Sequence, residues 1–365
     1  MTSSSVGSTS FISDWNSRIS LTQEFLSTSE RPKYVFGCNS LAQRISALVK
    51  VHGFIDDITQ SSTFEGLPVI RSVDVPPNSI VVSAIIGVLP VSVERHLHNL
   101  LVDHIDYFAF SKISKLDLAA IPFWEGAHED MRINLARYKK IADRMGDEVS
   151  QRTMSDLISF RYEMNLEHMI GYTNRQHEQY FEPFLQLDRM NLNFFDLGCF
   201  DGFTSAEFAR LSPQYSSISA FEPMSRLHSD CCNNLRELRN CVVHNFGASD
   251  LEQSLIFVDD GSSSTVSSGE GELVSLKRLD DLTLPRPDLI KIDIEGAELQ
   301  ALRGMAGILQ ESRPMMAIAC YHYPNEILEI VDFWDSIGLT GTLELRHYTE
   351  GTTETVLFIV PNGDQ

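Results

Sequence analysis

Two glycines and two aspartates cluster between a strand-like run and a helix-like run in the second half of the chain. The segment Asp196-Leu-Gly198-Cys199-Phe-Asp201-Gly202 follows the apolar run NFFDL and precedes SAEFARL. At such a strand-to-helix turn, glycine lets the backbone approach a ligand, and the start of the helix offers free amide donors. The five numbered residues are therefore candidates for binding a polar small molecule. A tight turn that needs glycine only for its shape would give the same spacing.

Another acidic residue follows the next strand-like run. The run SISAF ends at Glu222-Pro223, about 20 residues after the glycine turn. A carboxylate at this place in a doubly wound sheet hydrogen-bonds ribose hydroxyls. The alternative is a charge at the start of the following helix. The third run ends at Gly247, Ala248 and Ser249, whose small side chains leave room for a flat base. Together these strand ends predict a nucleoside-binding crevice.

Two further acids lie on one side of the fourth run, Lys291-Ile-Asp293-Ile-Glu295-Gly296. Side chains repeat every second residue along a strand, so Asp293 and Glu295 project in the same direction. Two acids on a buried strand are costly unless they are paired or used. They are candidates for contact with a reacting group, and ion pairs with Lys291 or Arg303 are the structural alternative.

Histidines near the last strands are candidate bases. His322 follows the run MMAIAC at the sheet edge where ligands gather in such folds, and its ordinary pKa of about 6.5 suits proton abstraction. The alternative is a ring packed between Tyr321 and Tyr323. His347 is the reserve base, and Arg346 beside it could bind an acidic or hydroxyl-rich acceptor. Both could equally face solvent from a hairpin.

The predicted catalytic set is thus His322, Asp293 and Glu295. Oxygen-rich sites suit Mg²⁺, and these three residues could together hold a divalent cation. They lack a diagnostic spacing, so no metal is assigned.

The candidate residues must be positioned by strands whose ends meet at one edge of a sheet. Five strand-like runs, several of them separated by helix-like stretches, are followed by two alternating β runs, LTGTLELRHY and ETVLFIVP. Strands that alternate with helices favour a parallel α/β sheet. The fold class predicted for residues 191–365 is a doubly wound sheet with an antiparallel end hairpin.

The first half of the chain has a different organisation. Residues 1–30 are rich in Ser and Thr and are expected to form a flexible tail with one short helix around Trp15 to Phe25. Residues 31–118 are expected to form a smaller Rossmann-like domain, and residues 119–190 a helical connector. Gly37-Cys-Asn39 stands where a dinucleotide fingerprint would stand. Asn39 replaces the glycine that normally permits close approach of a pyrophosphate, which favours a degenerate or architectural role.

Composition narrows the function classes. The chain has 365 residues, of which 43% are hydrophobic and 22% charged, enough for two globular domains. Of 50 acidic residues, 27 lie in residues 191–365, beside 11 of the 29 basic ones. This field repels polyphosphates, so nucleic acid is not expected as a partner. No apolar run approaches the ~20 residues of a membrane span, and no signal peptide begins the sequence. Six cysteines without a CxxC pair indicate a reduced, cytoplasmic protein.

Several of these segments resemble one protein family. The motifs D-L-G-x-x-D-G-x-T-S, A-F-E-P, N-x-G-A-S-D and K-I-D-I-E-G-A-E, followed by R-H-Y…E-T-V-L-F, resemble those of the FkbM-type methyltransferases. These are class I enzymes that use S-adenosylmethionine (SAM). The resemblance covers about residues 178–360, in members with an extra N-terminal domain. The dipeptide Cys199-Phe200 departs from the family pattern.

The resemblance implies roles for residues singled out above. Asp196, Gly198 and Gly202 would shape the methionine end of a SAM pocket, and Glu222 would hold the ribose. Ala248 and Ser249 would border the adenine, while Asp293 and Glu295 would face the methyl group and its acceptor.

The predicted function is SAM-dependent O-methylation of a small sugar-like or otherwise polyhydroxylated acceptor, with a general base. The acceptor class comes from the resemblance, and the sequence leaves a homo-oligomer open. Two alternatives remain: an NAD(P)-dependent oxidoreductase that works through the N-terminal domain, and a non-catalytic SAM-binding scaffold.

Overall fold

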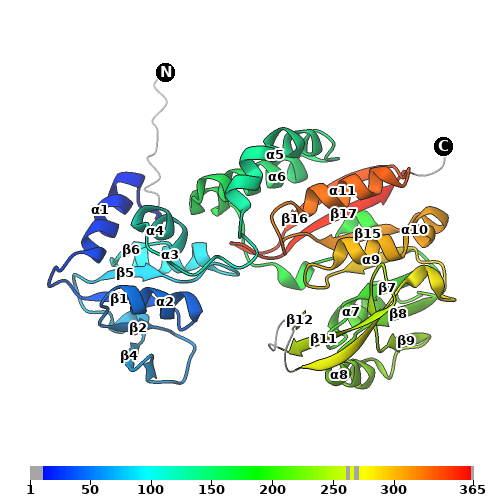
Figure 1. Ribbon diagram of the computed structural model, residues 1–365, viewed down its shortest axis with the longest axis horizontal. Coiled ribbons are helices and arrows are strands. Elements are labelled where there is room, and N and C mark those ends of the chain that lie inside the picture. The colour runs from blue at the N-terminus through cyan, green and yellow to red at the C-terminus, as the bar shows by residue number, and fades with distance from the viewer. Residues whose placement is uncertain (1–10, 260–263, 267–270, 363–365) are drawn as a thin grey trace. The chain divides into compact units, whose positions relative to one another are not determined.

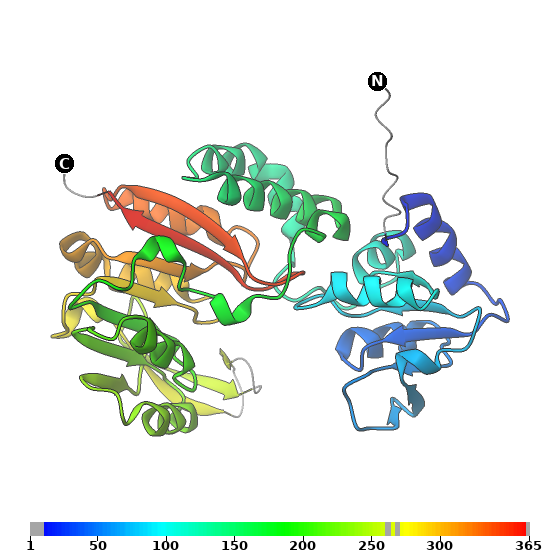
Figure 2. The same cartoon turned by 180° about the vertical axis from the view of Figure 1, so that it is seen from behind.

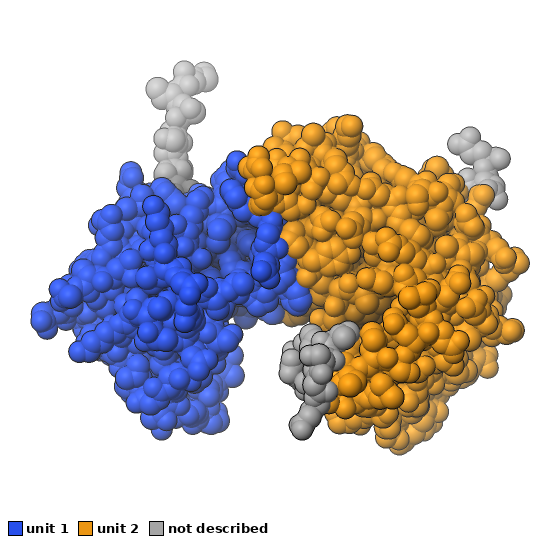
Figure 3. All heavy atoms as spheres, in the orientation of Figure 1, with its two compact units in different colours: residues 1–128, 156–174, 349–353 blue, residues 129–155, 175–348, 354–365 orange. Residues whose placement is uncertain are grey.

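The computed structural model describes residues 11–259, 264–266 and 271–362, which form two compact units (Figure 3). Unit 1 comprises residues 1–128, 156–174 and 349–353, and unit 2 comprises residues 129–155, 175–348 and 354–365. Each unit therefore combines segments that are far apart in the sequence.

Unit 1 contains a six-stranded sheet with the strand order β3-β4-β2-β1-β5-β6 (Figure 1). Its strands are β1 (Lys33–Phe36), β2 (Gly53–Ile55), β3 (Thr63–Phe64), β4 (Leu67–Ile70), β5 (Ile80–Ser83) and β6 (Asp103–Ile105). Its helices include α1 (Trp15–Leu26), α2 (Ser40–Leu48), α3 (Pro90–Asn99) and α4 (Tyr107–Ser114), with a 3-10 turn η1 (Ser72–Asp74). All pairs except β3 with β4 are parallel, which confirms the predicted Rossmann-like fold.

The segment predicted to be helical carries two long helices, α5 (Ala127–Ala142) and α6 (Glu148–Glu163). Three 3-10 turns follow, η2 (Leu166–Met169), η3 (Gln176–Glu178) and η4 (Pro183–Leu185).

Unit 2 is built on a seven-stranded sheet with the order β16-β17-β15-β14-β7-β8-β9. The strands are β7 (Asn193–Leu197), β8 (Ser217–Phe221), β9 (Cys241–His244), β14 (Leu289–Ile292), β15 (Met315–Ala319), β16 (Gly341–His347) and β17 (Thr355–Pro361). Strands β7, β8, β9, β14 and β15 pair in parallel, and β17 lies antiparallel between β15 and β16. The predicted doubly wound sheet with an antiparallel end hairpin is confirmed.

Helices cover both faces of this sheet. They are α7 (Phe203–Leu211), α8 (Ser225–Leu235), α9 (Glu298–Gly304), α10 (Ala306–Ser312) and α11 (Glu326–Ser336), with a 3-10 turn η5 (Leu279–Asp281). Helices α9, α10 and α11 lie over the face that is turned to the viewer in Figure 1, and the chain from η3 to η4 crosses the opposite face, seen in Figure 2.

A second sheet of four strands was not predicted. Its order is β10-β13-β11-β12, with β10 (Gly247–Ala248), β11 (Gln253–Asp259), β12 (Ser264–Val266) and β13 (Glu272–Lys277). The predicted third strand is therefore divided, because β9 ends at His244 and β10 pairs with β13 instead of with the main sheet. The Asn245 side chain donates to the carbonyls of Glu222 and Pro223 at this bend.

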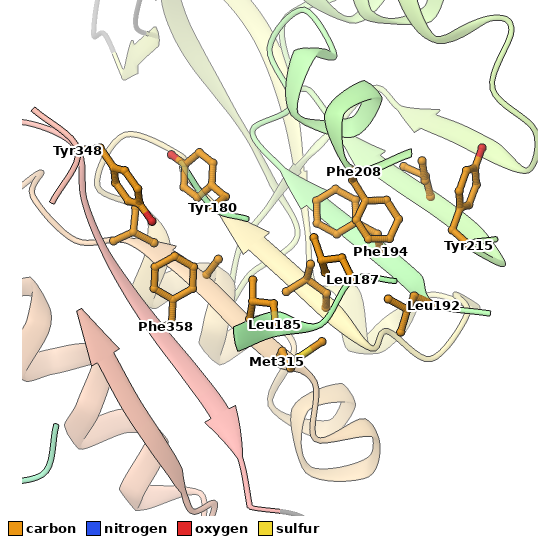
Figure 4. Packing of buried hydrophobic residues seen from close by; sticks show 14 residues of the cluster. Tyr180, Leu185, Leu187, Leu192, Phe194, Phe208, Tyr215, Met315, Tyr348 and Phe358 are labelled. Carbon is orange, nitrogen blue, oxygen red and sulfur yellow. The ribbon is translucent and has the colours of Figure 1, made fainter. Parts of the chain in front are cut away.

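The apolar side chains of one sheet face form a continuous core (Figure 4). Phe194 of β7 stacks on Phe208 of α7 with ring centroids 4.3 Å apart. Leu185 and Leu187, which precede β7, are buried in the same cluster. Burial of such side chains contributes about 1.5–3 kcal/mol each and fixes the sheet whose strand ends carry the polar residues.

Among the described residues, no helix combines the length and the hydropathy needed to cross a membrane.

Candidate active site

A buried ion pair lies beneath the site. Asp196 of β7 and Lys291 of β14 are partners in the parallel register, so their side chains meet on the same face. The Lys291 Nζ is 3.2 Å from Asp196 Oδ1, and the two side chains are 3% and 0% exposed. Ser205 Oγ donates to the other Asp196 oxygen at 2.7 Å. Burial alone would lower the pKa of Lys291, but Asp196 and Asp293 outweigh burial and raise it. Lys291, one of the two alternative ion-pair partners considered for Asp293 and Glu295, thus pairs with Asp196.

The same lysine holds the glycine turn. Lys291 Nζ donates to the carbonyl of Gly198 at 2.7 Å, directly after β7. Gly198 has φ 77°, and a Cβ there would lie 1.9 Å from the Asp293 carbonyl oxygen. Gly202 has φ 90°, and its Cβ would lie 2.9 Å from Leu235. Both positions require glycine for conformation and for space, and the turn brings the chain close to the end of β14.

Glu222 ties this turn to the end of β8. Its Oε2 accepts the Phe200 amide at 3.2 Å, and its Oε1 accepts the Met224 amide at 2.9 Å. The residue is 5% exposed, and burial raises the pKa of its carboxyl to about 7. Each carboxylate oxygen keeps a lone pair beyond its amide bond, so the group can still accept hydroxyl hydrogens.

The structure gives Asp201 and Cys199 local contacts. Asp201 Oδ1 accepts the Phe203 amide at the start of α7. Cys199 is buried, with its Sγ 3.4 Å from the Sγ of Cys231.

A cavity of about 250 Å³ opens at this strand edge. Gly198, Cys199, Phe200 and Asp201 line one part of it, and Lys291 and Asp293 line another. The rest of its lining consists of Gln176, His177, Gln179, Tyr180, Phe181, Phe203, Thr204, Glu207 and Glu354. A larger cavity of about 640 Å³ lies at the opposite edge, near Asp288 and Met315 at the beginnings of β14 and β15. It contains none of the predicted site residues.

The structure does not place the third strand end in the 250 Å³ cavity. Ala248 and Ser249 are 6% and 5% exposed. A Cβ on Gly304 of α9 would lie 1.9 Å from the Ser249 carbonyl oxygen, so this backbone packs directly against the helix. Gly247, Ala248 and Ser249 therefore do not line the cavity, because β10 joins the second sheet.

Asp293 is held at the cavity by a residue that the sequence did not single out. The Tyr180 hydroxyl donates to Asp293 Oδ2 at 2.5 Å. Lys291 Nζ lies over the Tyr180 ring, 5.3 Å from the ring centroid. Glu354 lines the same cavity and accepts the Gln179 side-chain amide at 2.7 Å. Burial and the nearby Asp293 raise the pKa of Glu354. Tyr180 precedes β7 without periodicity, so spacing could not identify it.

His322 joins the predicted catalytic acids. Its Nε2 lies 3.5 Å from Asp293 Oδ1 and 3.8 Å from Glu295 Oε2, so the three residues predicted to be catalytic are close together. On its other side, Nδ1 lies 3.2 Å from Glu298 Oε1 and 3.8 Å from Glu326 Oε1.

This setting argues against His322 as the general base. Burial would lower the pKa of its ring, but the neighbouring carboxyl groups of Glu298, Glu326 and Asp293 raise it to about 11. The imidazole is therefore protonated at neutral pH and cannot accept a proton. Glu295 is better suited: burial raises its pKa to about 7, and its side chain is 28% exposed. Its backbone has φ 57°, a left-handed conformation that is rare for a glutamate.

The reserve residues are buried instead of facing solvent or an acceptor. His347 Nδ1 hydrogen-bonds Thr355 Oγ1, and the residue is 2% exposed. Arg346 donates to Asp147 at 2.7 Å and to Ser150 at 2.7 Å. Both side chains serve the packing around β16 and neither lines the 250 Å³ cavity.

The cluster also has the geometry to hold a cation. Asp293, Glu298 and His322 each bring one ligand atom to within 4.8 Å of the others. A metal would need the neutral imidazole, however, and the surrounding carboxylates favour the protonated ring.

Comparisons with known proteins agree with the predicted family. Residues 196–346 match the family model of the methyltransferase FkbM domain, so the predicted resemblance is confirmed for this segment. No curated protein matches the chain. A solved FkbM methyltransferase from Methylobacillus flagellatus KT is similar over 95% of this chain and 94% of its own, with a TM-score of 0.75 and 18% identity. At this identity, the likeness shows the fold alone.

Other solved structures match only about half of the chain. Precorrin-6y C5,15-methyltransferase from Geobacter metallireducens GS-15 covers 48% of this chain and 82% of its own, with 18% identity and a TM-score of 0.31. Fibrillarin from Aeropyrum pernix, solved with natively bound SAM, covers 48% of this chain and 68% of its own, with 14% identity and a TM-score of 0.32.

Proposed function

Because residues 196–346 match the family model of the methyltransferase FkbM domain, we propose that the chain transfers a methyl group from SAM to a hydroxyl of a small, sugar-like acceptor. The observation that carries this proposal is the 250 Å³ cavity, which joins the glycine turn after β7 to Asp293 at the end of β14.

The residues present fit the cofactor. Two glycines with positive φ allow close approach at Gly198 and Gly202, and Glu222 is fixed beside the same turn by its bond to the Phe200 amide. In this proposal, the turn and the start of α7 hold the aminoacyl part of SAM, and Glu222 accepts the ribose hydroxyls. Ala248 and Ser249 do not line the cavity, so they can border the adenine only where the base extends beyond it.

The acceptor side of the cavity is polar. Gln176, Gln179 and His177 line it together with the carboxylates of Asp293 and Glu354. Amide and carboxylate groups supply both donors and acceptors, which suits a molecule with several hydroxyls. Lys291 in the lining is already paired with Asp196, and the lining also contains four acidic side chains, which disfavours an anionic acceptor.

The chain contributes alignment and proton removal. Bound SAM supplies a methyl group on a sulfonium whose leaving thioether is neutral. Holding a hydroxyl in line with that group is worth up to about 7–11 kcal/mol of the barrier. Glu295 accepts the hydroxyl proton near the transition state, a step that typically contributes about 10²–10⁴-fold. Asp293, anchored by Tyr180, orients the acceptor beside it.

Calorimetry and a product assay test the proposal. We expect SAM and S-adenosylhomocysteine to bind with saturable heat, and S-adenosylhomocysteine to be released when neutral sugars or polyols are added. Absence of SAM binding would overturn the function. Release only with amine acceptors would overturn the hydroxyl assignment and keep methyl transfer.

A further inference from the structure

Each ring nitrogen of His322 faces two carboxylates. Nδ1 lies between Glu298 of α9 and Glu326 of α11, and Nε2 lies between Asp293 and Glu295 of the turn after β14. The His322 side chain is 1% exposed, so the ring is shielded from bulk water. The histidine therefore connects two carboxylates in the interior to two carboxylates near the cavity.

The interior pair is fixed by backbone amides. Glu298 Oε1 accepts the Ile294 amide at 2.9 Å and the Gly296 amide at 3.3 Å, which holds α9 against the turn that carries Asp293 and Glu295. Glu326 Oε2 accepts the His322 amide at 2.8 Å. Both glutamates are 0% exposed, so their orientation is set by packing and by these bonds.

One oxygen of each glutamate is buried without a hydrogen-bond partner, namely Glu298 Oε2 and Glu326 Oε1. Two ionised carboxylates could not satisfy each other, but a proton on one of them supplies the missing donor. Burial raises the pKa of Glu326 to about 8, while the bonds from His322 and the backbone lower the pKa of Glu298 to about 2. Glu326 is thus the protonated member, and Glu298 carries the charge that faces the ring.

We propose that Glu298 and Glu326 are positioning residues that keep His322 a permanent imidazolium, and that this buried cation fixes Asp293 and Glu295 toward the acceptor. The part that concerns the acceptor rests on the proposed function. The state of the ring does not, because it follows from contacts within the fold.

The donor count of imidazole supports this assignment. A neutral imidazole has one N–H, so one of its nitrogens would present a lone pair to two carboxylates. Only the imidazolium has a donor for both sides. The other titratable neighbours do not compete for this role, since Tyr321, Tyr323 and Glu354 add hydroxyls or further negative charge. Their own pKa values are raised, mainly by burial.

The arrangement explains how a carboxylate base can remain in place. The negative charges of Asp293 and Glu354 raise the pKa of Glu295, and Asp293 also raises the pKa of Glu354. The imidazolium offsets this repulsion, and the Glu295 side chain beside it remains 28% exposed. Without the cation, the carboxylates of Asp293 and Glu295 would have to move apart or take up protons.

Nitrogen NMR of the histidine ring provides the test. The wild-type full chain is labelled at its histidine ring nitrogens, and the His322 signals are assigned from their loss in His322→Gln. We expect both ring nitrogens to remain protonated well above the ordinary histidine pKa of about 6.5. A His322 that titrates near this value would overturn the proposal, and the titration itself is measured on the wild-type chain without SAM or acceptor.

Two variants separate positioning from mere packing. We expect Glu298→Gln to lower the His322 pKa by more than one unit. The turnover of this variant should then fall as His322 loses its proton, at pH values where the turnover of the wild type does not change. Glu326→Gln, which resembles the protonated side chain, should leave the His322 titration nearly unchanged. Glu311→Gln, an exposed change on α10, is the matched control. If Glu298→Gln leaves the titration unchanged while the fold is retained, the proposal fails even when SAM binding is normal.

Discussion

Two neighbouring acid–base groups at the site have exchanged the roles that their types suggest. His322, the residue whose ordinary pKa suits a base, is enclosed by four carboxylates and is protonated, with a pKa of about 11. Glu295, an ordinary acid in sequence, has a pKa of about 7 because it is buried beside other acids. The residue types thus predicted where proton transfer takes place. The surroundings set the pKa values, and these make Glu295 rather than His322 the group that can accept a proton.

The pH dependence of methyl transfer should follow Glu295. A base must be deprotonated to act, so turnover is expected to fall as the pH drops through about 7 and to stay level above it. Glu295→Gln should lower turnover by about 10²–10⁴-fold with little change in SAM affinity. Steady-state kinetics and calorimetry measure the two effects. A variant with wild-type turnover would assign the base role to another group.

Glu222 should affect both the pH dependence of stability and the binding of SAM. Its pKa rises from 4.5 to about 7 on folding, so the folded state holds a proton that the unfolded chain has lost, and stability declines as the pH rises through this window. Glu222→Gln should abolish this decline of roughly 1–3 kcal/mol, because its side chain does not titrate. Its NH2 group cannot accept a backbone amide as a carboxylate oxygen does, so the variant should be less stable than the wild type below the window.

The same change should weaken SAM binding about 10–100-fold, because hydrogen bonds to a charged acceptor are each worth about 1.5–3 kcal/mol. Thermal unfolding and calorimetry follow the two quantities. Glu237→Gln, an exposed change beyond α8, serves as the control. Unchanged SAM affinity in Glu222→Gln would remove the ribose assignment.

At the level of strands and helices, most of what positions the site was predictable. The runs that end at Asp196, Glu222, Asp293 and His322 are the carboxyl ends of β7, β8, β14 and β15, as periodicity indicated. The exception is the run ending at Gly247. Its sequence indicates one continuous strand. In the structure, the Asn245 side chain donates to the two carbonyls after β8, and the chain leaves the main sheet there for the second sheet.

The interior glutamates could not be placed in this way. Glu326 follows His322 by one helical turn in sequence, and Glu298 stands in the motif I-E-G-A-E, yet only the packing of α9 and α11 shows that both reach one ring. Long-range contacts of this kind leave no periodic trace.

The register of β7 and β14 predicts a strong coupling between Asp196 and Lys291. Removing one partner of a buried pair leaves an unpaired charge and typically costs about 3–5 kcal/mol, so Lys291→Met should destabilise unit 2 by this amount. The double change Asp196→Asn and Lys291→Met should cost much less than the sum of the single changes. Urea unfolding of the four proteins gives the coupling energy. Additive costs would show that the pair does not act as a unit.

For the molecule as a whole, the N-terminal fold offers little room for a dinucleotide. The strand order reverses between β1 and β5, where such folds bind nucleotides. There the Asn39 side chain accepts the Ala42 amide and donates to the Ala84 carbonyl. Asp56, directly after β2, accepts the Ile58 and Thr59 amides.

Residues 349–353 belong to the same unit and lie against the loop after β5. Glu350 and Thr352 donate their amides to the carbonyls of Val88 and Ile86, and the Glu350 carboxylate accepts the Ser92 amide at 2.7 Å, in the first turn of α3. An acidic side chain already occupies the helix start that a phosphate would use.

We therefore expect no saturable binding of NADH to the full chain. Isothermal calorimetry with NADH checks this, with SAM as the positive comparison. Tight binding of NADH would contradict this interpretation of unit 1 and would restore the oxidoreductase alternative.

The place of β17 has a consequence for biosynthesis. This strand lies inside the larger sheet, between β15 and β16, although it is translated after both of them. A nascent polypeptide can pair β1 to β6 early, yet β15 keeps an open edge until β17 has left the ribosome. Termination before β17 would leave that edge permanently bare, so quality control of the newly made protein depends on the translation of this one strand.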